Sequence, residues 1–309
     1  MRDRLTVREV GLRDGLQIIK QFMPTEQKIE WCRREYEAGV KEMEICSFVP
    51  VKYIPQFSDA EDVVNFATSL PGFSASALAP NLYGATKAMD AGVHKVTCIV
   101  SASDSFNHAN VKRSTQDSLA EFKRIVDENN KRNGRDKGVK LIGGVSCAFG
   151  CTIEGKVPLS SIMPIVQQFM ESGVDEIALA DTVGYGDPLL VRQVFSAIGN
   201  EVGDTPMSAH FHNTRGTGLA NVVAALECGV RIFDSSIAGL GGCPNSPGAT
   251  GNIATEDLVF MLEAMGLDTG VDPQGLIEVR EYVKTALPDV RMFGHIGEVG
   301  LPKSFRQSA

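Results

Sequence analysis

The stretch Glu37-Ala-Gly-Val-Lys-Glu-Met-Glu-Ile-Cys46 decides the fold, because it ends a helix and begins a strand within a few residues. Gly39 favours the left-handed backbone conformation that terminates helices, and the apolar run after it is typical of a buried strand. The same ending, an acid, a small residue, glycine and valine, recurs at 90–93, 171–174 and 227–230. The recurrence predicts a chain built from repeated helix–strand units.

Short apolar, β-branched runs alternate with longer amphipathic stretches along the chain. This alternation predicts a parallel sheet, and about eight such units close into a (β/α)8 TIM barrel of the α/β class. A doubly wound open sheet is the alternative, but Gly11–Gly15 lacks the G-x-G-x-x-G spacing of its first turn. The expected strands are Leu5–Val10, Lys41–Cys46, Phe73–Leu78, Lys95–Val100, Lys140–Ser146, Glu176–Ala180, Met207–Phe211 and Arg231–Asp234. The expected helices are Thr25–Ala38 with Thr25 as its N-cap, Asp59–Ser69, Asn81–Ala91, Ser114–Asn130, Ser160–Ser172, Pro188–Asn200, Gly218–Cys228 and Thr255–Met265.

Length and composition limit the remaining possibilities. We expect one catalytic domain over residues 1–309, with a helical extension from about residue 270 that contains Leu276–Leu287. A net charge of −8 without a basic run disfavours nucleic-acid and membrane-surface partners. No stretch is apolar enough to span a membrane, and the N-terminus lacks the apolar segment of a signal peptide.

Cysteine usage points to a reducing compartment. Seven cysteines are scattered through the chain, mostly in apolar runs, which indicates reduced thiols and a cytoplasmic protein. A zinc site at Cys147 and Cys151 is disfavoured because no second pair of cysteines lies nearby.

Polar residues collect where the predicted strands end, which is the active-site face of such a barrel. His210 and His212 end the seventh strand, and residues two apart on a strand point to the same face, so both imidazoles can bind one ion. Asp14 after the first strand offers a carboxylate, and Asn252 after the eighth offers a neutral oxygen. This ligand set suits a divalent cation that acts as a Lewis acid, and Mg²⁺, Mn²⁺, Zn²⁺ and Co²⁺ are all compatible with it.

Other polar residues at the same strand ends are candidates for catalysis. Arg13 can neutralise an oxyanion or form an ion pair with Glu44 or Asp181. Cys243 lies in a glycine-rich loop, where a cysteine is a candidate acid, base or nucleophile. A polar loop that reaches the substrate is expected after the fourth strand, carrying Asn107, His108 and Asn110.

Three long motifs stand out: Glu9-Val-Gly-Leu-Arg-Asp-Gly-Leu-Gln17, Ser146-Cys-Ala-Phe-Gly-Cys-Thr-Ile-Glu-Gly155, and the run from Asp234 to Asp257 that contains Gly241-Gly-Cys-Pro244. Together they resemble the signature of the 3-hydroxy-3-methylglutaryl-CoA (HMG-CoA) lyases. The resemblance runs from about residue 5 to about residue 285. Isopropylmalate and homocitrate synthases share the barrel and metal site of this group, but the Gly-Gly-Cys-Pro loop separates the lyases from them.

The resemblance implies a role for each candidate residue. The ligands of the divalent cation, Mg²⁺ or Mn²⁺ with Zn²⁺ or Co²⁺ also compatible, would be Asp14, His210, His212 and Asn252. Arg13 would stabilise the enolate or carbonyl oxygen, Cys243 would transfer a proton, and the catalytic site would also include Asp181, Glu44 and Glu256. The residues near the acyl-CoA substrate would be Arg13, Gln17, Lys20 and Ser47. The resemblance also implies a homodimer or a higher homo-oligomer.

The implied reaction is a retro-Claisen cleavage of HMG-CoA to acetyl-CoA and the keto acid acetoacetate. The tertiary hydroxyl would bind the cation, the C2–C3 bond would break, and Cys243 would protonate the enolate of acetyl-CoA. Three departures leave the acyl group open: Asn213 replaces the aspartate usual after the second histidine, Ala178 stands where many members have serine, and Pro244-Asn-Ser-Pro247 differs from the common Tyr-Ala version. (R)-Citramalyl-CoA, cleaved to acetyl-CoA and pyruvate, is therefore the alternative substrate.

Three further functions make distinct predictions. A condensing synthase of the same group would release the CoA thiol from acetyl-CoA and a 2-keto acid, but the cysteine loop argues against it. A lysine Schiff-base aldolase needs a lysine at a strand end, and the sequence offers no obvious one. A non-catalytic binding barrel is disfavoured because polar residues gather at one end of the barrel.

Overall fold

The computed structural model describes residues 3–133, 138–242 and 251–305, and its sheet is a closed barrel with strand order β1 to β8. Neighbouring strands pair in parallel, including β8 with β1, which closes the ring. The TIM barrel predicted from the sequence is therefore confirmed. The strands are β1 Thr6–Glu9, β2 Glu42–Ser47, β3 Ser74–Leu78, β4 Lys95–Ser101, β5 Lys140–Ser146, β6 Glu176–Asp181, β7 Met207–Phe211 and β8 Ile232–Ser235.

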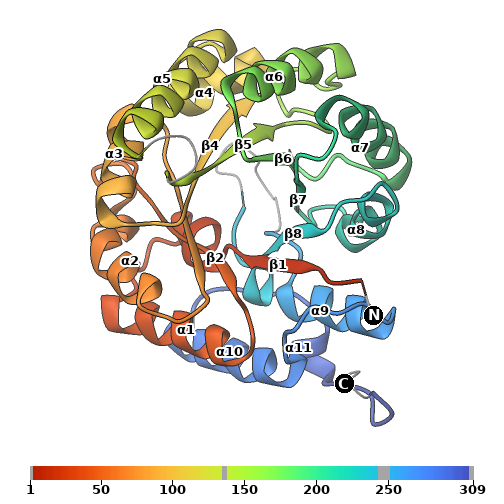
Figure 1. Ribbon diagram of the computed structural model, residues 1–309. Coiled ribbons are helices and arrows are strands. Elements are labelled where there is room, and N and C mark those ends of the chain that lie inside the picture. The colour runs from red at the N-terminus through yellow and green to blue at the C-terminus, as the bar shows by residue number, and fades with distance from the viewer. Residues whose placement is uncertain (1–2, 134–137, 243–250, 306–309) are drawn as a thin grey trace.

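Helices surround the strands in an outer ring (Figure 1). The helices are α1 Thr25–Glu37, α2 Ala60–Thr68, α3 Leu82–Ala91, α4 Asp104–Val111, α5 Thr115–Asn133, α6 Leu159–Ser172, α7 Pro188–Val202, α8 Gly218–Glu227, α9 Thr255–Ala264, α10 Pro273–Ala286 and α11 Ile296–Val299. Three single turns complete the described structure, namely the π-helix Gly11–Gly15 and the 3₁₀ turns Pro55–Phe57 and Ile237–Gly239.

The repeated glycines end helices as the sequence predicted. Gly39, Gly92, Gly173 and Gly229 all have φ between 87° and 100°, the left-handed region that glycine adopts without a Cβ clash. After each of them the chain enters a strand of the barrel within a few residues. The sequence motif thus marks the helix-to-strand turns of four of the repeated units.

Two local predictions were wrong. Thr25 is the first residue of α1 rather than its N-cap, which is Pro24, and the Thr25 hydroxyl donates instead to Asp59 Oδ2 at 2.8 Å. The predicted polar loop after the fourth strand is helix α4, which contains Asn107 and His108. The Ser103 hydroxyl accepts a hydrogen bond from Phe106 N and so caps this helix at its start.

The hydrophobic core lies between the barrel and its helices. Gly143 faces outward on β5, where a Cβ would lie 2.7 Å from the Phe169 ring of α6. Phe211 also faces outward from β7 and packs against Phe195 of α7, with ring centroids 6.4 Å apart. Because side chains alternate along a strand, His210 and His212 on either side of Phe211 point into the barrel.

Helix α10 lies beside α1, and α11 lies beside α9 and α10 (Figure 1). Helix α10 packs against α1, where Tyr282 Oη donates to Gln27 O at 3.2 Å and the Arg34 guanidinium lies 4.6 Å from the Tyr282 ring. Among the described helices, none combines the length and the hydropathy needed to cross a bilayer.

Candidate metal centre

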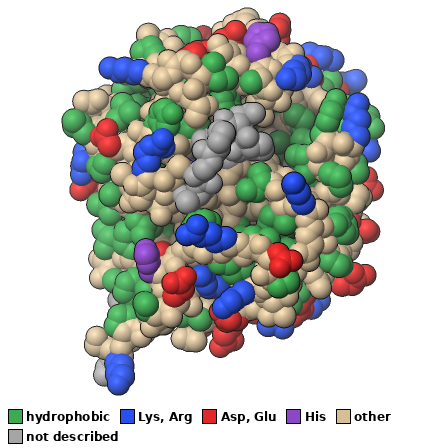
Figure 2. Space-filling view, turned by 180° about the vertical axis from the view of Figure 1, so that it is seen from behind, with side chains coloured by type: hydrophobic (Ala, Val, Ile, Leu, Met, Phe, Trp, Pro, Cys, Tyr) green, Lys and Arg blue, Asp and Glu red, His purple; other side chains and the backbone are tan. Residues whose placement is uncertain are grey.

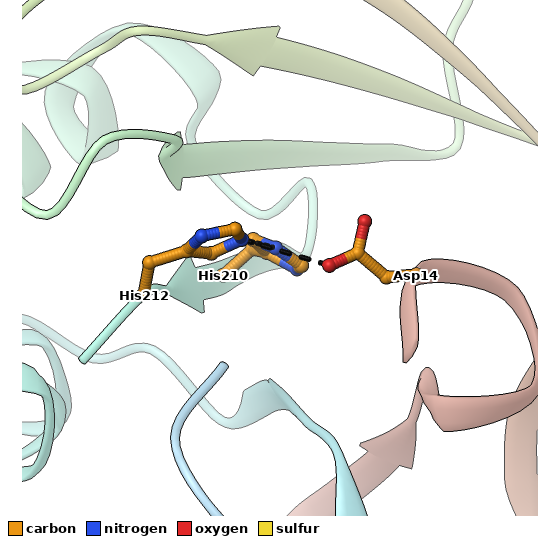
Figure 3. Close-up of side chains that lie close together, drawn as sticks. All are labelled: Asp14, His210 and His212. Atoms are coloured by element: carbon orange, nitrogen blue, oxygen red, sulfur yellow. Dashed lines mark hydrogen bonds and ion pairs between the residues drawn. The ribbon is translucent and has the colours of Figure 1, made fainter. Parts of the chain in front are cut away.

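Asp14, His210 and His212 meet inside the mouth of the barrel, and one ligand atom from each lies within 4.8 Å of the others. The two histidine rings project side by side from β7 toward the Asp14 carboxylate (Figure 3). The two Nε2 atoms are 3.1 Å apart, and His212 Nε2 is 3.6 Å from Asp14 Oδ2. All three side chains are buried. These distances show that the structure brings together the three principal predicted ligands.

Asp14 reaches the site from the single-turn π-helix Gly11–Gly15 that follows β1. Such turns are rare and occur often at functional sites. Gly11 is required here because a Cβ would lie 2.6 Å from Glu9 Oε1 and 2.7 Å from the Trp31 ring. The tight turn therefore carries Asp14 back over the end of the barrel.

Asn252 lies against the same three residues. Its Nδ2 donates to Asp14 Oδ2 at 2.7 Å and to Leu240 O at 2.9 Å, and its backbone forms an isolated bridge with His212. Its Oδ1 is buried and has no hydrogen-bond partner among the described residues. An amide oxygen left unpaired beside a carboxylate is a donor atom that a cation would satisfy.

The charge state of Asp14 also suits a cation. Burial alone would raise the pKa of Asp14, but the Arg13 guanidinium and the His212 side chain hold it well below its ordinary value. The carboxylate is therefore ionised at neutral pH. Two imidazole nitrogens, one carboxylate and one amide oxygen, all buried and converging, fit a divalent metal ion.

Arg13 links the cluster to Glu44, which lies on β2. Arg13 Nε donates to Glu44 Oε2, and Arg13 Nη1 donates to Asp14 Oδ1 at 2.5 Å. The ion pair expected with Glu44 or Asp181 is thus formed with Glu44, and Asp14 is a second partner. Gln17, expected near the substrate, donates from Nε2 to Asp14 Oδ1 at 2.7 Å and so helps to hold this ligand.

Asp181 lies at the end of β6, where its carboxylate holds the following turn. Oδ1 accepts from Tyr185 N at 2.8 Å and Oδ2 accepts from Gly186 N at 2.9 Å. The residue is fully buried, and burial raises the pKa of Asp181 above its ordinary value. Asp181 therefore shapes the loop between β6 and α7.

Glu256 braces the turn after β8. Its Oε1 accepts from Arg280 Nη1 at 2.6 Å, and its Oε2 accepts from Ala238 N at 3.0 Å. Burial raises the pKa of Glu256 to about 7, against the opposing charge of Arg280. Ala238 has a φ of 55°, an unfavourable conformation for a residue with a Cβ, so this hydrogen bond helps to hold a strained turn.

We expect Glu256→Gln to lower the free energy of unfolding by about 3 kcal/mol, because it leaves the buried Arg280 without its carboxylate. Urea denaturation would measure the change. Glu298→Gln is the matched control, since Glu298 lies 3.8 Å from Arg280 but is 64 % exposed, and its loss should change stability little. Equal stability of the two variants would contradict a bracing role for Glu256.

Two predicted substrate residues differ in exposure. Lys20 is exposed, whereas Ser47 is buried at the end of β2. The Ser47 hydroxyl donates to Leu78 O at 3.2 Å, and the residue borders a cavity of about 470 Å³ together with Asn81 and Tyr83. Cys243, the predicted acid, lies outside the described residues.

Gly241 packs onto two candidate metal ligands and Gly251 onto the turn after β8, contacts that were not predicted from the sequence. Gly241 has a φ of 112°, and a Cβ there would lie 2.6 Å from Asn252 Nδ2 and 2.8 Å from Asp14 Oδ2. A Cβ on Gly251 would lie 2.0 Å from Gly239 O. Gly241 therefore lies against the candidate metal centre and Gly251 against residues 239–241, and the glycine-rich composition was the available signal.

We expect Gly241→Ala to lower cation affinity by about tenfold or more, because its methyl group would push Asp14 and Asn252 apart. Calorimetric titration with Mn²⁺ would measure this. Gly266→Ala is the matched control: its φ of 82° imposes similar backbone strain, but nothing lies within 4 Å of the added Cβ. Unchanged affinity in Gly241→Ala would show that the glycine is not required by the ligands.

Asn213 follows the second histidine but turns away from the cluster. Its Oδ1 accepts from Gly218 N at 3.0 Å, at the first residue of α8. Its side chain thus holds the turn that leads into this helix, a role that an aspartate would fill equally well. The residue that sequence reasoning did miss is Asp234, which contacts His210 from β8. The sequence did contain a signal for this contact. Asp234 is an acidic residue on β8, which pairs with β7, and it lies at the register position of His210.

Comparison with known proteins places the chain in a family. The sequence profile of the HMGL-like family matches residues 4–283. Human mitochondrial hydroxymethylglutaryl-CoA lyase is 39% identical over 284 residues, covering 92% of this chain and 86% of the relative. The Bacillus subtilis hydroxymethylglutaryl-CoA lyase is 37% identical over 281 residues, covering 91% of this chain and 92% of the relative.

Solved structures agree with this assignment. The HMG-CoA lyase from Acinetobacter baumannii, in complex with coenzyme A and 3-methylmalate, matches with a TM-score of 0.91 at 36% identity and covers 99% of this chain and 98% of that one. The Bacillus subtilis HMG-CoA lyase matches with a TM-score of 0.90 at 35% identity and covers 96% of this chain and 98% of that one. The chain therefore belongs to the HMGL-like family and is a carbon–carbon lyase.

Proposed function

We propose that this chain cleaves HMG-CoA to acetyl-CoA and acetoacetate with the help of a divalent cation. The observation that carries the proposal is the buried cluster of Asp14, His210 and His212 beside Arg13, in a chain of the HMGL-like family. The relatives named above are HMG-CoA lyases, so neither citramalyl-CoA nor a condensation reaction is favoured as the alternative.

The proposed ligands of the cation are Asp14, His210, His212 and Asn252. A divalent cation bound there would supply Lewis acidity, which makes the tertiary hydroxyl of the substrate more acidic. Mn²⁺ accepts both the oxygen and the nitrogen ligands of this set, and Mg²⁺ is the other cation we propose. Metal analysis of the purified protein would distinguish them from Zn²⁺ and Co²⁺.

Arg13 is proposed to stabilise the negative charge that develops on the thioester oxygen as the C2–C3 bond breaks. Its Nε and Nη1 are fixed by Glu44 and Asp14, so its orientation is set before the substrate binds. Asp181 is proposed to handle the proton of the tertiary hydroxyl, because burial raises its pKa and makes its carboxylate a better base. The proton that the C2 enolate must gain is assigned to Cys243. Glu44 is proposed to act by holding Arg13 in place, and Glu256 by holding the turn after β8.

An acyl-CoA carries phosphates, and the surface offers dispersed basic groups. On the face shown in Figure 2, lysine and arginine side chains lie among acidic and hydrophobic ones. Exposed Lys20 is our candidate for contact with a phosphate, and Ser47 and Gln17 for contacts nearer the reacting atoms. We further propose that residues 1–309 form one domain, that the protein is a homodimer or a higher homo-oligomer, and that it is cytoplasmic. The described cysteines are unpaired, as a reducing compartment would require.

The proposed function is tested by a coupled assay for acetyl-CoA and acetoacetate. Purified protein would be stripped of metal, supplied with Mg²⁺ or Mn²⁺, and offered HMG-CoA and (R)-citramalyl-CoA in parallel. We expect cation-dependent acetyl-CoA formation from HMG-CoA, with acetoacetate in equal amount. Formation of pyruvate from citramalyl-CoA alone would replace the proposed substrate, and no product from either thioester would refute the proposal.

A further inference from the structure

The carboxylate of Asp234 lies between His210 and Arg8, and each of its oxygens faces one of them. Asp234 Oδ2 is 3.1 Å from His210 Nδ1, on the side of the ring away from His212, and Oδ1 accepts from Arg8 Nη1 at 3.2 Å. We propose that Asp234, held by Arg8, is a positioning residue that fixes the tautomer and orientation of His210 for metal binding. The inference rests on the metal site proposed above.

Arg8 is fixed in turn by a buried group of charges deeper in the barrel. Its Nε donates to Glu42 Oε1 at 2.6 Å, and its Nη2 donates to Glu176 Oε1 at 2.6 Å. Lys95 Nζ also donates to Glu42 Oε1, at 2.7 Å. Each Arg8 donor group has an assigned acceptor, so the guanidinium cannot turn without breaking other ion pairs. These ion pairs of Arg8 therefore also fix the position of the Asp234 carboxylate.

The strand register alone produces this arrangement, because all three residues lie on strands and none on a loop. His210 on β7 and Arg8 on β1 are both register partners of Asp234 on β8. Register partners on neighbouring strands point to the same side of the sheet, here the barrel interior. Regular barrel geometry therefore places the three side chains in a row that ends at the candidate metal centre.

An ionised Asp234 permits only one neutral tautomer of His210. Asp234 Oδ1 lies in a buried ion pair with the Arg8 guanidinium, which has only donors, so the Asp234 side chain is a carboxylate whose oxygens accept hydrogen bonds. His210 Nδ1 must then carry a hydrogen and donate to Oδ2. The lone pair of a neutral His210 ring is left on Nε2, the atom that faces His212 Nε2 and Asp14. Metal-bound histidines commonly have a carboxylate behind them for this reason.

Among the described residues, none gives the other histidine an equivalent support. His212 Nδ1 is buried and makes no hydrogen bond to any described residue. Asp234 therefore acts on one imidazole of the pair. Its effect is separable from the general requirement for two histidines, and a variant of Asp234 can test it without removing a ligand.

Asp234→Asn is the decisive substitution because an amide has only one oxygen. If that oxygen accepts from Arg8, the amide NH₂ faces His210 Nδ1 and favours the tautomer with its hydrogen on Nε2, where the cation should bind. We expect Asp234→Asn to weaken Mn²⁺ binding by about 10–100-fold, measured by calorimetry on the metal-free protein. This readout does not depend on turnover.

Glu42→Gln is the matched control. Glu42 is buried and binds the same Arg8 guanidinium, but it is not in contact with His210, and its substitution removes the same negative charge from the same group. Glutamine keeps one oxygen that can accept from Arg8 Nε, so Arg8 should stay in place, and we expect Glu42→Gln to bind Mn²⁺ nearly as tightly as the wild type. An equal loss in both variants would show that the charge of the group matters and the orientation of His210 does not, which would overturn the proposal.

The remaining outcomes are also decisive. Wild-type affinity in Asp234→Asn would refute the positioning role, whereas a wild type that binds no cation would refute the proposed metal site itself. If Asp234→Asn does not fold, ¹⁵N spectra of the Zn²⁺-loaded wild type provide the test, and the chain has only five histidines to resolve. We expect a hydrogen on Nδ1 of His210, and its absence would overturn the proposal.

Discussion

Replacing His212 with alanine is expected to abolish tight cation binding and to lower kcat/KM for HMG-CoA by about 10³-fold or more, because Lewis-acid stabilisation contributes several kcal/mol to such a reaction. Folding should change little in the metal-free protein. His212 Nδ1 has no partner among the described residues, so the substitution removes a buried polar group that is poorly satisfied. Calorimetry with Mn²⁺, steady-state kinetics and urea denaturation would measure the three effects.

His108→Ala is the control for this prediction. His108 lies on α4 with a side chain that is 56 % exposed, and the candidate metal cluster does not include it. We expect this variant to retain both cation binding and activity. If His212→Ala kept wild-type cation affinity, His212 would not be a ligand, whatever its effect on turnover.

Arg13→Met is expected to lower kcat by about 10²–10³-fold, the usual cost of removing one preorganised donor from an anionic transition state. The variant should still bind Mn²⁺, because the Asp14 carboxylate and both imidazoles remain in the chain. Kinetics and calorimetry on the same preparation would separate the two properties. A higher KM with unchanged kcat would instead mean that Arg13 binds the ground state and the transition state equally.

Arg13→Lys tests whether charge alone is sufficient. Arg13 donates from two different nitrogens to Glu44 and Asp14, and a lysine ammonium cannot reproduce this forked geometry. We expect Arg13→Lys to recover only part of the lost kcat. Full recovery would contradict the view that the orientation of the guanidinium matters.

Much of the fold was predictable because local signals agreed with one another. The glycine-terminated helices and the apolar runs after them both predict the same helix–strand turns, and the strand positions found differ from the expected ones by at most one residue at either end. Helix α4 was missed because its polar composition resembles that of a loop. Its start depends on the Ser103 cap rather than on an apolar face.

The candidate site was partly predictable for a different reason. The spacing of His210 and His212 specifies a common direction on any strand, and the polar residues at the ends of β1 and β7 had to meet once the sheet closed. The contacts of Gln17 with Asp14 and of Glu256 with Arg280 were not predictable. The first depends on the side-chain conformations of two residues only three positions apart, and the second on how helix α10 packs against α9.

The sequence by itself determined the barrel, the family resemblance and the pair of histidines on one strand face, because strand alternation and helix termination are local properties. Only the tertiary structure determined which residue of the neighbouring strand contacts His210. Closure of the barrel aligns β7, β8 and β1, so that Asp234 meets both His210 and Arg8. It also brings Gly241 against Asp14, through contacts between residues more than two hundred positions apart. Such contacts form because a closed sheet fixes the distance between its strands, which no local pattern in the chain encodes.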